Sequence, residues 1–268
     1  MKIAIIGAGN MGGAVVRGLA EGRSVAASDI YVSNPSTAKL DALKRDYPTM
    51  HTTTDNRAVV ADADVVILAV KPWKVEVVLE EIKPVLDYER QAVASMVGGL
   101  GFTQLDEWLD KGDGLLPATY LLIPNTAIAT LSSMTFLAVR RTSAAMDDAM
   151  VAIFSELGEV MVVEESQIGA ATSLASCGIA YALRYIRAAM EGGVELGIRA
   201  DDAKHIVMQT LRGAVDVLAA NGTHPEAEID RVTTPGGLTI KGLNAMEAAG
   251  FTHSVIEGLR ASTPKQKK

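Results

Sequence analysis

The chain has 268 residues, 49% hydrophobic and 21% charged, which is long enough for one large or two modest domains and excludes a disordered or collagen-like protein. Its 25 Lys and Arg against 32 Asp and Glu give a formal net charge of −7 with no basic stripe, which excludes nucleic acid and anionic membranes as expected partners. The single cysteine, Cys177, cannot form an intramolecular disulfide, and the four histidines lack metal-ligand spacing, so we expect a cytoplasmic protein without a structural metal.

Residues 1–163 alternate short β-rich runs with helical segments, a pattern typical of a parallel sheet covered by helices. The predicted strands cover residues 2–6, 30–32, 65–70, 92–96, 116–122, 134–139 and 160–163. The predicted helices between them cover residues 11–21, 36–47, 56–61, 73–86, 103–109 and 144–157.

The first predicted strand runs into a glycine-rich turn that opens a helix, which is the dinucleotide-binding signature in its proper context. Gly7 permits the tight turn, Gly9 lacks the Cβ that would hold a pyrophosphate away from the backbone, and Gly12 lets the helix pack close to the strand. The free N–H groups at the start of that helix would face the diphosphate. The sequence therefore predicts a Rossmann-type domain.

The second predicted strand ends without the carboxylate that binds ribose hydroxyls in NAD sites. Asn34 and Ser36 follow this strand, with Lys39 nearby, and such neutral or basic groups tolerate a 2′-phosphate. We therefore expect NADPH as the cofactor, with NADH possible. The same residues would also suit the cap of the next helix, and the two interpretations are compatible.

Three later strands also end in segments placed to meet a ligand, because ligands bind at the carboxyl edge of open α/β sheets. These segments contain Lys71, between a buried strand and a proline, the run Met96-Val97-Gly98, and Pro124-Asn125-Thr126.

From residue 164 the strand signal stops and helical segments follow, which predicts a second, all-helical domain over residues 164–268. The predicted helices cover residues 168–196, 201–220, 225–232, 238–249 and 252–262. Residues 168–183 carry no charge but are too short and too rich in Ala, Gly, Ser and Thr for a membrane span. We expect this stretch to be a helix at a subunit interface.

A loop of hydroxyl and glycine residues, 232–241, opens one of these helices. The consecutive N–H groups of Gly236, Gly237 and Leu238, with the hydroxyls of Thr234 and Thr239, would bind a small carboxylate. An ordinary helix cap is the alternative. No nucleophilic triad or pair of catalytic carboxylates accompanies the loop. Because hydride transfer to a protonated imine needs no strong protein acid, an imine fits this sequence better than a ketone.

Four motifs, in this order and at these intervals, resemble the pyrroline-5-carboxylate reductase family, and the resemblance covers essentially the whole chain. They are Gly7-Ala8-Gly9-Asn10-Met11-Gly12, Ala69-Val70-Lys71-Pro72, Pro124-Asn125-Thr126 and Thr234-Pro235-Gly236-Gly237-Leu238-Thr239. The resemblance implies reduction of 1-pyrroline-5-carboxylate to L-proline with NADPH or NADH, the last step of proline synthesis. It also implies a nucleotide-binding domain followed by a helical dimerisation domain, with homodimers sometimes assembled into larger oligomers.

Residue by residue, the resemblance assigns the cofactor to the first domain and the substrate to the second. It places the cofactor diphosphate at Asn10 and Met11, the 2′-phosphate at Asn34 and Ser36, and the adenosine near Asn56. The remaining residues that it implies for the cofactor cleft and nicotinamide are Ala69, Val70, Lys71, Pro72, Met96, Val97 and Gly98. Thr234, Gly236, Gly237 and Leu238 would hold the substrate carboxylate, and Thr239 would hydrogen-bond the ring nitrogen and act in catalysis.

Three positions depart from the family pattern. Leu121 stands where the family usually has arginine, Ala127 replaces a proline, and Ile179 replaces another proline in the long dimer helix. These departures keep alternatives open: a non-catalytic NADP-binding regulator, a reductase of a related cyclic imine acid, or another small nicotinamide oxidoreductase.

Overall fold

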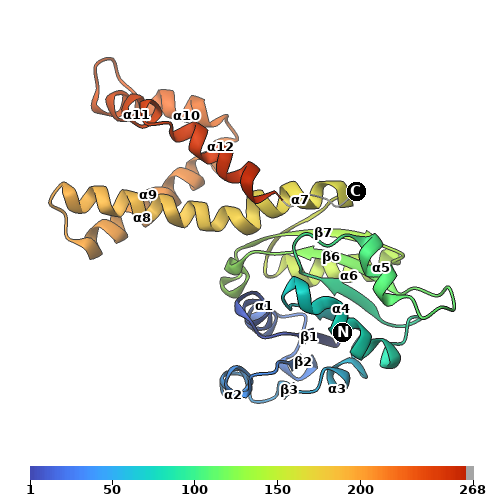
Figure 1. The fold of residues 1–268 in the computed structure, drawn as a ribbon. Helices are drawn as coiled ribbons and strands as arrows, with labels where there is room; N and C mark the ends of the chain where they lie inside the picture. The colour runs from blue at the N-terminus through green and yellow to red at the C-terminus, as the bar shows by residue number, and fades with distance from the viewer. Residues whose placement is uncertain (264–268) are drawn as a thin grey trace. The chain divides into compact units, whose positions relative to one another are not determined.

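The computed structural model describes residues 1–263, and these form two compact units (Figure 1). Unit 1 contains residues 1–177 and Thr263, and unit 2 contains residues 178–262. The first unit extends beyond residue 163 because Ile168 and Ala171 are buried in its hydrophobic core. The division between the units therefore falls after Cys177, whereas the predicted nucleotide-binding domain ends at residue 163.

Unit 1 is built on one eight-stranded sheet with the strand order β3-β2-β1-β4-β5-β6-β7-β8. The strands are β1 Ile3–Ile6, β2 Ile30–Ser33, β3 His51–Thr53, β4 Val65–Leu68, β5 Ala92–Ser95, β6 Ala118–Ile123, β7 Ser133–Arg140 and β8 Gly158–Val162. The predicted fold class, a Rossmann-type domain, is confirmed. Two details of the prediction were wrong: β3 was missed, and β7 runs antiparallel to β6, so the sheet is not wholly parallel.

Helices cover both faces of this sheet, because alternate strand residues point to opposite sides. The helices are α1 Asn10–Glu21, α2 Thr37–Asp46, α3 Asn56–Val60, α4 Val75–Ile82, α5 Phe102–Leu109, α6 Ala144–Ser155 and α7 Ile168–Ala171. On one face, Ile3 and Ile5 of β1 belong to a core with α1, α2 and α6. On the other, Ala4 and Ile6 belong to a core with α3, α4, α5 and α7.

The single helix expected over residues 168–196 is interrupted. A π-helical segment, Thr172–Cys177, separates α7 from α8, Gly178–Glu195. The Thr172 and Ser173 hydroxyls donate hydrogen bonds to the carbonyl oxygens of Ile168 and Gly169, at 2.7 and 3.3 Å. Hydroxyl groups that bond back to the preceding turn bend helices, which accounts for the altered winding at this point.

Unit 2 consists of helices only among its described residues. They are α8 Gly178–Glu195, α9 Ala200–Asn221, α10 Pro225–Val232, α11 Leu238–Ala248 and α12 Phe251–Ser262. α8 and α9 lie side by side, and a Cβ at Gly193 would come within 3.1 Å of the Ala203 Cβ. Across residues 1–263, no helix combines the length and hydrophobicity that a membrane span requires.

Glu156, immediately after α6, fixes the turn that follows α1. Its carboxylate accepts hydrogen bonds from the Arg23 N–H at 2.6 Å, the Ser24 N–H at 2.9 Å and the Ser24 hydroxyl at 2.6 Å. The Ser24 hydroxyl first, and then the two backbone N–H groups, hold the pKa of Glu156 below its usual value. The unfolded chain therefore binds this proton more readily than the folded chain does. The hydrogen bonds to the charged carboxylate stabilise the fold at pH values above the unfolded-state pKa. This stabilisation is lost as the pH falls through the lowered pKa of the folded state.

We expect Glu156→Gln to lower the free energy of unfolding by roughly 0.5–1 kcal/mol at neutral pH, the size of a solvent-screened charged hydrogen bond. The difference from wild type should shrink between neutral pH and an acidic pH at which the lowered pKa of Glu156 has been passed, because the carboxylate then loses its charge. Urea midpoints at both pH values measure this effect, with Glu159→Gln on the adjacent strand β8 as the control. An equal deficit at both pH values would contradict the assignment.

Candidate functional site

The glycine turn between β1 and α1 is fixed by close backbone contacts. Gly7 has φ +107°, and a Cβ there would lie 2.5 Å from the Ala69 carbonyl oxygen. A Cβ at Gly12 would lie 2.0 Å from the carbonyl oxygen of Gly7. Both positions therefore require glycine, as the sequence predicts: one for the turn itself, the other for the close approach of α1 to it.

Gly9 differs from these two glycines because a Cβ there would meet nothing within 4 Å. It caps α1, and the first intrahelical bond of that helix runs from the Gly13 N–H to the Gly9 carbonyl oxygen, at 2.8 Å. The N–H groups of Asn10, Met11 and Gly12 consequently have no acceptor within the helix, and the first turn carries no acidic side chain. Open space beside unpaired donors fits the diphosphate of a dinucleotide.

Asn34 and Ser36 lie beside this turn, at the end of β2. The Asn34 Oδ1 accepts a hydrogen bond from the Ala8 N–H at 3.0 Å, and its Nδ2 donates to the Ser36 carbonyl oxygen at 3.1 Å. Asn34 is buried, whereas Ser36 is exposed and caps α2 without a hydrogen bond from its side chain. Asn34 thus braces the glycine turn, and the Ser36 hydroxyl is available to a ligand.

Asn56 begins α3, after the missed strand β3. Its Oδ1 accepts a hydrogen bond from the Ser33 hydroxyl at 2.7 Å, and its Nδ2 donates to Glu81 of α4 at 2.8 Å. Sequence reasoning missed Ser33 and Glu81 at this edge, because the contacts join positions 23 and 25 residues apart. The one sequence signal for these contacts was an acidic residue, Glu81, on the helix that follows β4.

The ends of β4 and β5 continue the same edge. The Ala69 N–H donates to Ile6 at 2.9 Å and the Met96 N–H donates to Leu68 at 3.0 Å, so the parallel ladder extends into both loops. Lys71 is exposed at the cap of the 3-10 turn Pro72–Lys74. The structure therefore brings all the residues predicted for the cofactor to the carboxyl edge of the sheet, at its switch point between β1 and β4.

The residues predicted for the substrate belong to unit 2, at the start of α11. Gly236 has φ +71°, and the Gly237 N–H donates to the Thr234 carbonyl oxygen at 2.9 Å. Gly237 caps α11 without a side-chain bond, so the N–H groups of Leu238 and Thr239 have no acceptor within the helix. The loop thus presents N–H groups and exposed threonine hydroxyls, as a site for a small carboxylate requires.

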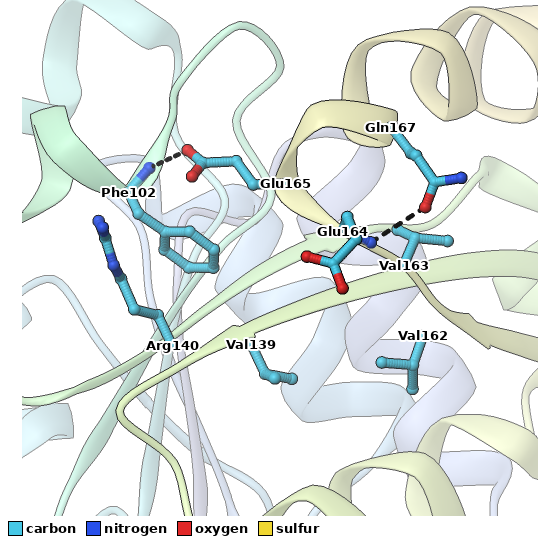
Figure 2. Close-up of a pocket in the computed structure, with 8 residues that line it drawn as sticks. All are labelled: Phe102, Val139, Arg140, Val162, Val163, Glu164, Glu165 and Gln167. Atoms are coloured by element: carbon cyan, nitrogen blue, oxygen red, sulfur yellow. Dashed lines mark hydrogen bonds between the residues drawn. The ribbon is translucent and has the colours of Figure 1, made fainter.

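A pocket of about 380 Å³ lies elsewhere in unit 1, between the start of α5 and the ends of β7 and β8 (Figure 2). Its polar groups already bond one another: the Phe102 N–H donates to Glu165 at 2.7 Å, and the Glu164 N–H donates to Gln167 at 3.1 Å. None of the predicted site residues lines it. In the part of the chain that the structure describes, no cluster of His, Cys, Asp and Glu could hold a metal ion.

Comparison with known families and proteins gives consistent matches. A family model described as pyrroline-5-carboxylate reductase dimerisation matches residues 165–268, and one described as NADP oxidoreductase, coenzyme F420-dependent, matches residues 2–98. Pyrroline-5-carboxylate reductase 2 of Dictyostelium discoideum is 34% identical over 100% of this chain and 92% of its own length. Pyrroline-5-carboxylate reductase 1 of that organism is 38% identical over 98% of this chain, which spans only 49% of that protein.

Solved structures give the same result. The pyrroline-5-carboxylate reductase of Coxiella burnetii is 30% identical, with a TM-score of 0.83 and coverage of 98% of this chain and 96% of its own. The pyrroline carboxylate reductase of Plasmodium falciparum, solved with NADP bound, has a TM-score of 0.90 over 100% of this chain and 97% of its own, at 24% identity. At 24% identity, the similarity to the Plasmodium falciparum structure shows the fold alone.

Proposed function

This chain belongs to the pyrroline-5-carboxylate reductase family, and from that premise we propose that it reduces 1-pyrroline-5-carboxylate to L-proline, the last step of proline synthesis. The observation that carries the proposal is similarity along the whole chain: two reductases of this name, at 34% and 31% identity, align with 100% and 95% of it. The reaction is a hydride transfer to the imine carbon of a small cyclic acid.

NADPH is the proposed hydride donor, with NADH possible, and when bound its nicotinamide supplies the hydride. The open space at Gly9 and the unpaired N–H groups of Asn10 and Met11 support binding of the diphosphate. The exposed Ser36 hydroxyl and the absence of a carboxylate after β2 support a 2′-phosphate. The remaining residues proposed to bind the cofactor are Gly7, Gly12, Asn34, Asn56, Ala69, Val70, Lys71, Pro72, Met96, Val97 and Gly98.

The start of α11 is the proposed substrate site. The Leu238 N–H and the Thr234 hydroxyl would hold the carboxylate. Gly236 would shape the turn through its positive φ, and Gly237 would close it through its N–H bond to the Thr234 carbonyl oxygen. Thr239, in the first turn of the helix, would hydrogen-bond the ring nitrogen. A protonated imine is already electrophilic, so Thr239 needs only to orient the ring and hold the nitrogen-bound proton.

Thr239→Ala tests this role. We expect purified protein to oxidise NADPH only when 1-pyrroline-5-carboxylate is present, and the variant to lose about 10- to 100-fold in kcat, the effect of one hydrogen bond to a charged group. Thr239→Ser should retain most of the activity because it keeps the hydroxyl. Both variants should bind NADPH as the wild type does, as measured by titration of nicotinamide fluorescence.

The outcomes separate the alternatives. Unchanged turnover in Thr239→Ala would remove this residue from the mechanism. Tight NADPH binding without turnover of any cyclic imine acid would favour a non-catalytic regulator. The buried position of Leu121, where the family usually has arginine, is the observation behind that second candidate.

Unit 2 supports a homodimer as the working form, with larger oligomers built from dimers as the extension of the proposal. Within residues 178–262, Ala203 alone is buried, and large apolar side chains are exposed on several helices. Large apolar side chains gathered on the outside of a unit mark an interaction surface. We therefore propose that a second copy covers these helices. On this proposal residues 1–163 bind the nucleotide, and residues 164–268 mediate dimerisation and bind substrate. The cytoplasm is the proposed compartment.

A further inference from the structure

Glu81 of α4 lies beside the carboxyl edge of the sheet but has no role in the proposed diphosphate site or in the proposed substrate site. It is half-buried, and its carboxylate Oε2 accepts the hydrogen bond from the Asn56 Nδ2 at 2.8 Å. Its carbonyl oxygen also accepts a hydrogen bond from the Arg57 Nε at 2.9 Å. α4 is thereby joined to the first turn of α3 by a side-chain contact and a backbone contact.

The carboxylate decides which way the Asn56 amide faces. A carboxylate only accepts hydrogen bonds, so the Nδ2 of Asn56 must point to Glu81 and its Oδ1 must point to Ser33. The Ser33 hydroxyl then has to donate. Without Glu81, Ser33 could equally accept from a flipped amide, because a hydroxyl group both donates and accepts.

The position of Asn56 makes its orientation matter for the nucleotide. In a dinucleotide-binding sheet the ribose of the adenosine half lies at the end of β2. Ser33 is the last residue of β2, is fully buried, and its carbonyl oxygen accepts the Gly7 N–H at 2.8 Å. Asn56 is therefore tied to the strand end that carries the adenosine half, and its second N–H and second lone pair remain for a ligand.

We infer that Glu81 is a positioning residue for nucleotide binding, which acts through Asn56 on the adenosine half of the cofactor. This inference rests on the proposed function only in taking NADPH as the cofactor. It distinguishes Glu81 from Ser36, because a group that acts on the adenosine half should affect NADPH and NADH alike, whereas a contact to the 2′-phosphate would affect NADPH alone.

The test is the affinity of Glu81→Gln for NADPH, NADH and 2′,5′-ADP, measured by calorimetry without substrate. Glutamine keeps the shape and the backbone bond to Arg57 but can also donate, so it no longer fixes the Asn56 amide. We expect all three affinities to fall by about fivefold to tenfold, the effect of one misoriented hydrogen bond. Glu80→Gln, the neighbouring charge change on an exposed side chain of α4, should leave them unchanged.

A double-mutant cycle with Asn56→Ala shows whether Glu81 acts through Asn56. We expect the double variant to bind NADPH no more weakly than Asn56→Ala alone, and the urea midpoint of Glu81→Gln to match that of Glu80→Gln. Additive losses, unchanged affinities, or a loss confined to NADPH would each overturn the inference. Failure to reduce 1-pyrroline-5-carboxylate would refute the proposed function but would leave these binding results intact.

Discussion

Gly12→Ala is expected to weaken NADPH binding about 10- to 100-fold and to destabilise unit 1. The added Cβ would lie 2.0 Å from the carbonyl oxygen of Gly7 and 2.9 Å from the Cβ of Ala69. Neither is the end of a flexible side chain, so α1 has to move away from the turn, at a cost of about 1–3 kcal/mol or more for overpacking. That movement also displaces the first-turn N–H groups proposed to hold the diphosphate. Calorimetric titration with NADPH and urea denaturation measure the two effects.

Gly13→Ala is the matched control for this prediction. It changes the next residue of the same helix, which is also buried, but its Cβ would lie 3.4 Å from the flexible end of Arg17 and 3.7 Å from the Ala8 carbonyl oxygen. We expect unchanged NADPH affinity and equal or slightly greater stability, since alanine favours helix over glycine by about 1 kcal/mol. Wild-type affinity in Gly12→Ala, or equal losses in both variants, would show that the close approach at Gly12 is not what shapes the site.

The glycine turn could be predicted because its determinants are local. Gly7, Gly9 and Gly12 lie within six residues, between an apolar run and an amphipathic helix. In the structure Gly7 and Gly12 each meet a separate steric requirement, and Gly9 leaves open space beside the helix N-terminus. The carboxyl edge followed from the same logic, because the recognised strands β1, β2, β4, β5 and β6 run in the same direction and end there, whereas β7 and β8 run the opposite way.

The features that escaped prediction depend on distant partners. β3, with the polar sequence His51-Thr52-Thr53, has no apolar alternation and exists through its pairing with β2, where His51 stacks on Tyr31 with ring centroids 4.5 Å apart. Because β3 was not predicted, the position of Asn56 beside Ser33 was not predicted either. The direction of β7 was equally hidden, since apolar periodicity identifies a strand but carries no information about the orientation of its neighbour.

Val215→Glu is expected to break the proposed homodimer and, with it, the structure of unit 2. Val215 is 65% exposed on α9, within a unit whose single buried side chain is Ala203. If a second copy covers this surface, the variant places an unpaired carboxylate in the interface, at a cost of about 3–5 kcal/mol per copy. That cost raises the dimer dissociation constant at least ~100-fold. We expect a dimer for wild type and a monomer for the variant in analytical ultracentrifugation, with a lower helical signal in circular dichroism.

Val77→Glu is the control, because Val77 is 63% exposed on α4 of unit 1 and receives the same change of size and charge. It should sediment and melt as the wild type does, since unit 1 holds its fold through a large buried core that Val77 does not enter. A wild-type chain that stays monomeric at all concentrations would refute the dimer outright. A dimer that survives in Val215→Glu would exclude this face of α9 from the interface and leave the other exposed helices of unit 2 to supply it. Because an all-helical unit with one buried side chain cannot hold its fold through internal packing alone, loss of assembly and loss of helix should occur together.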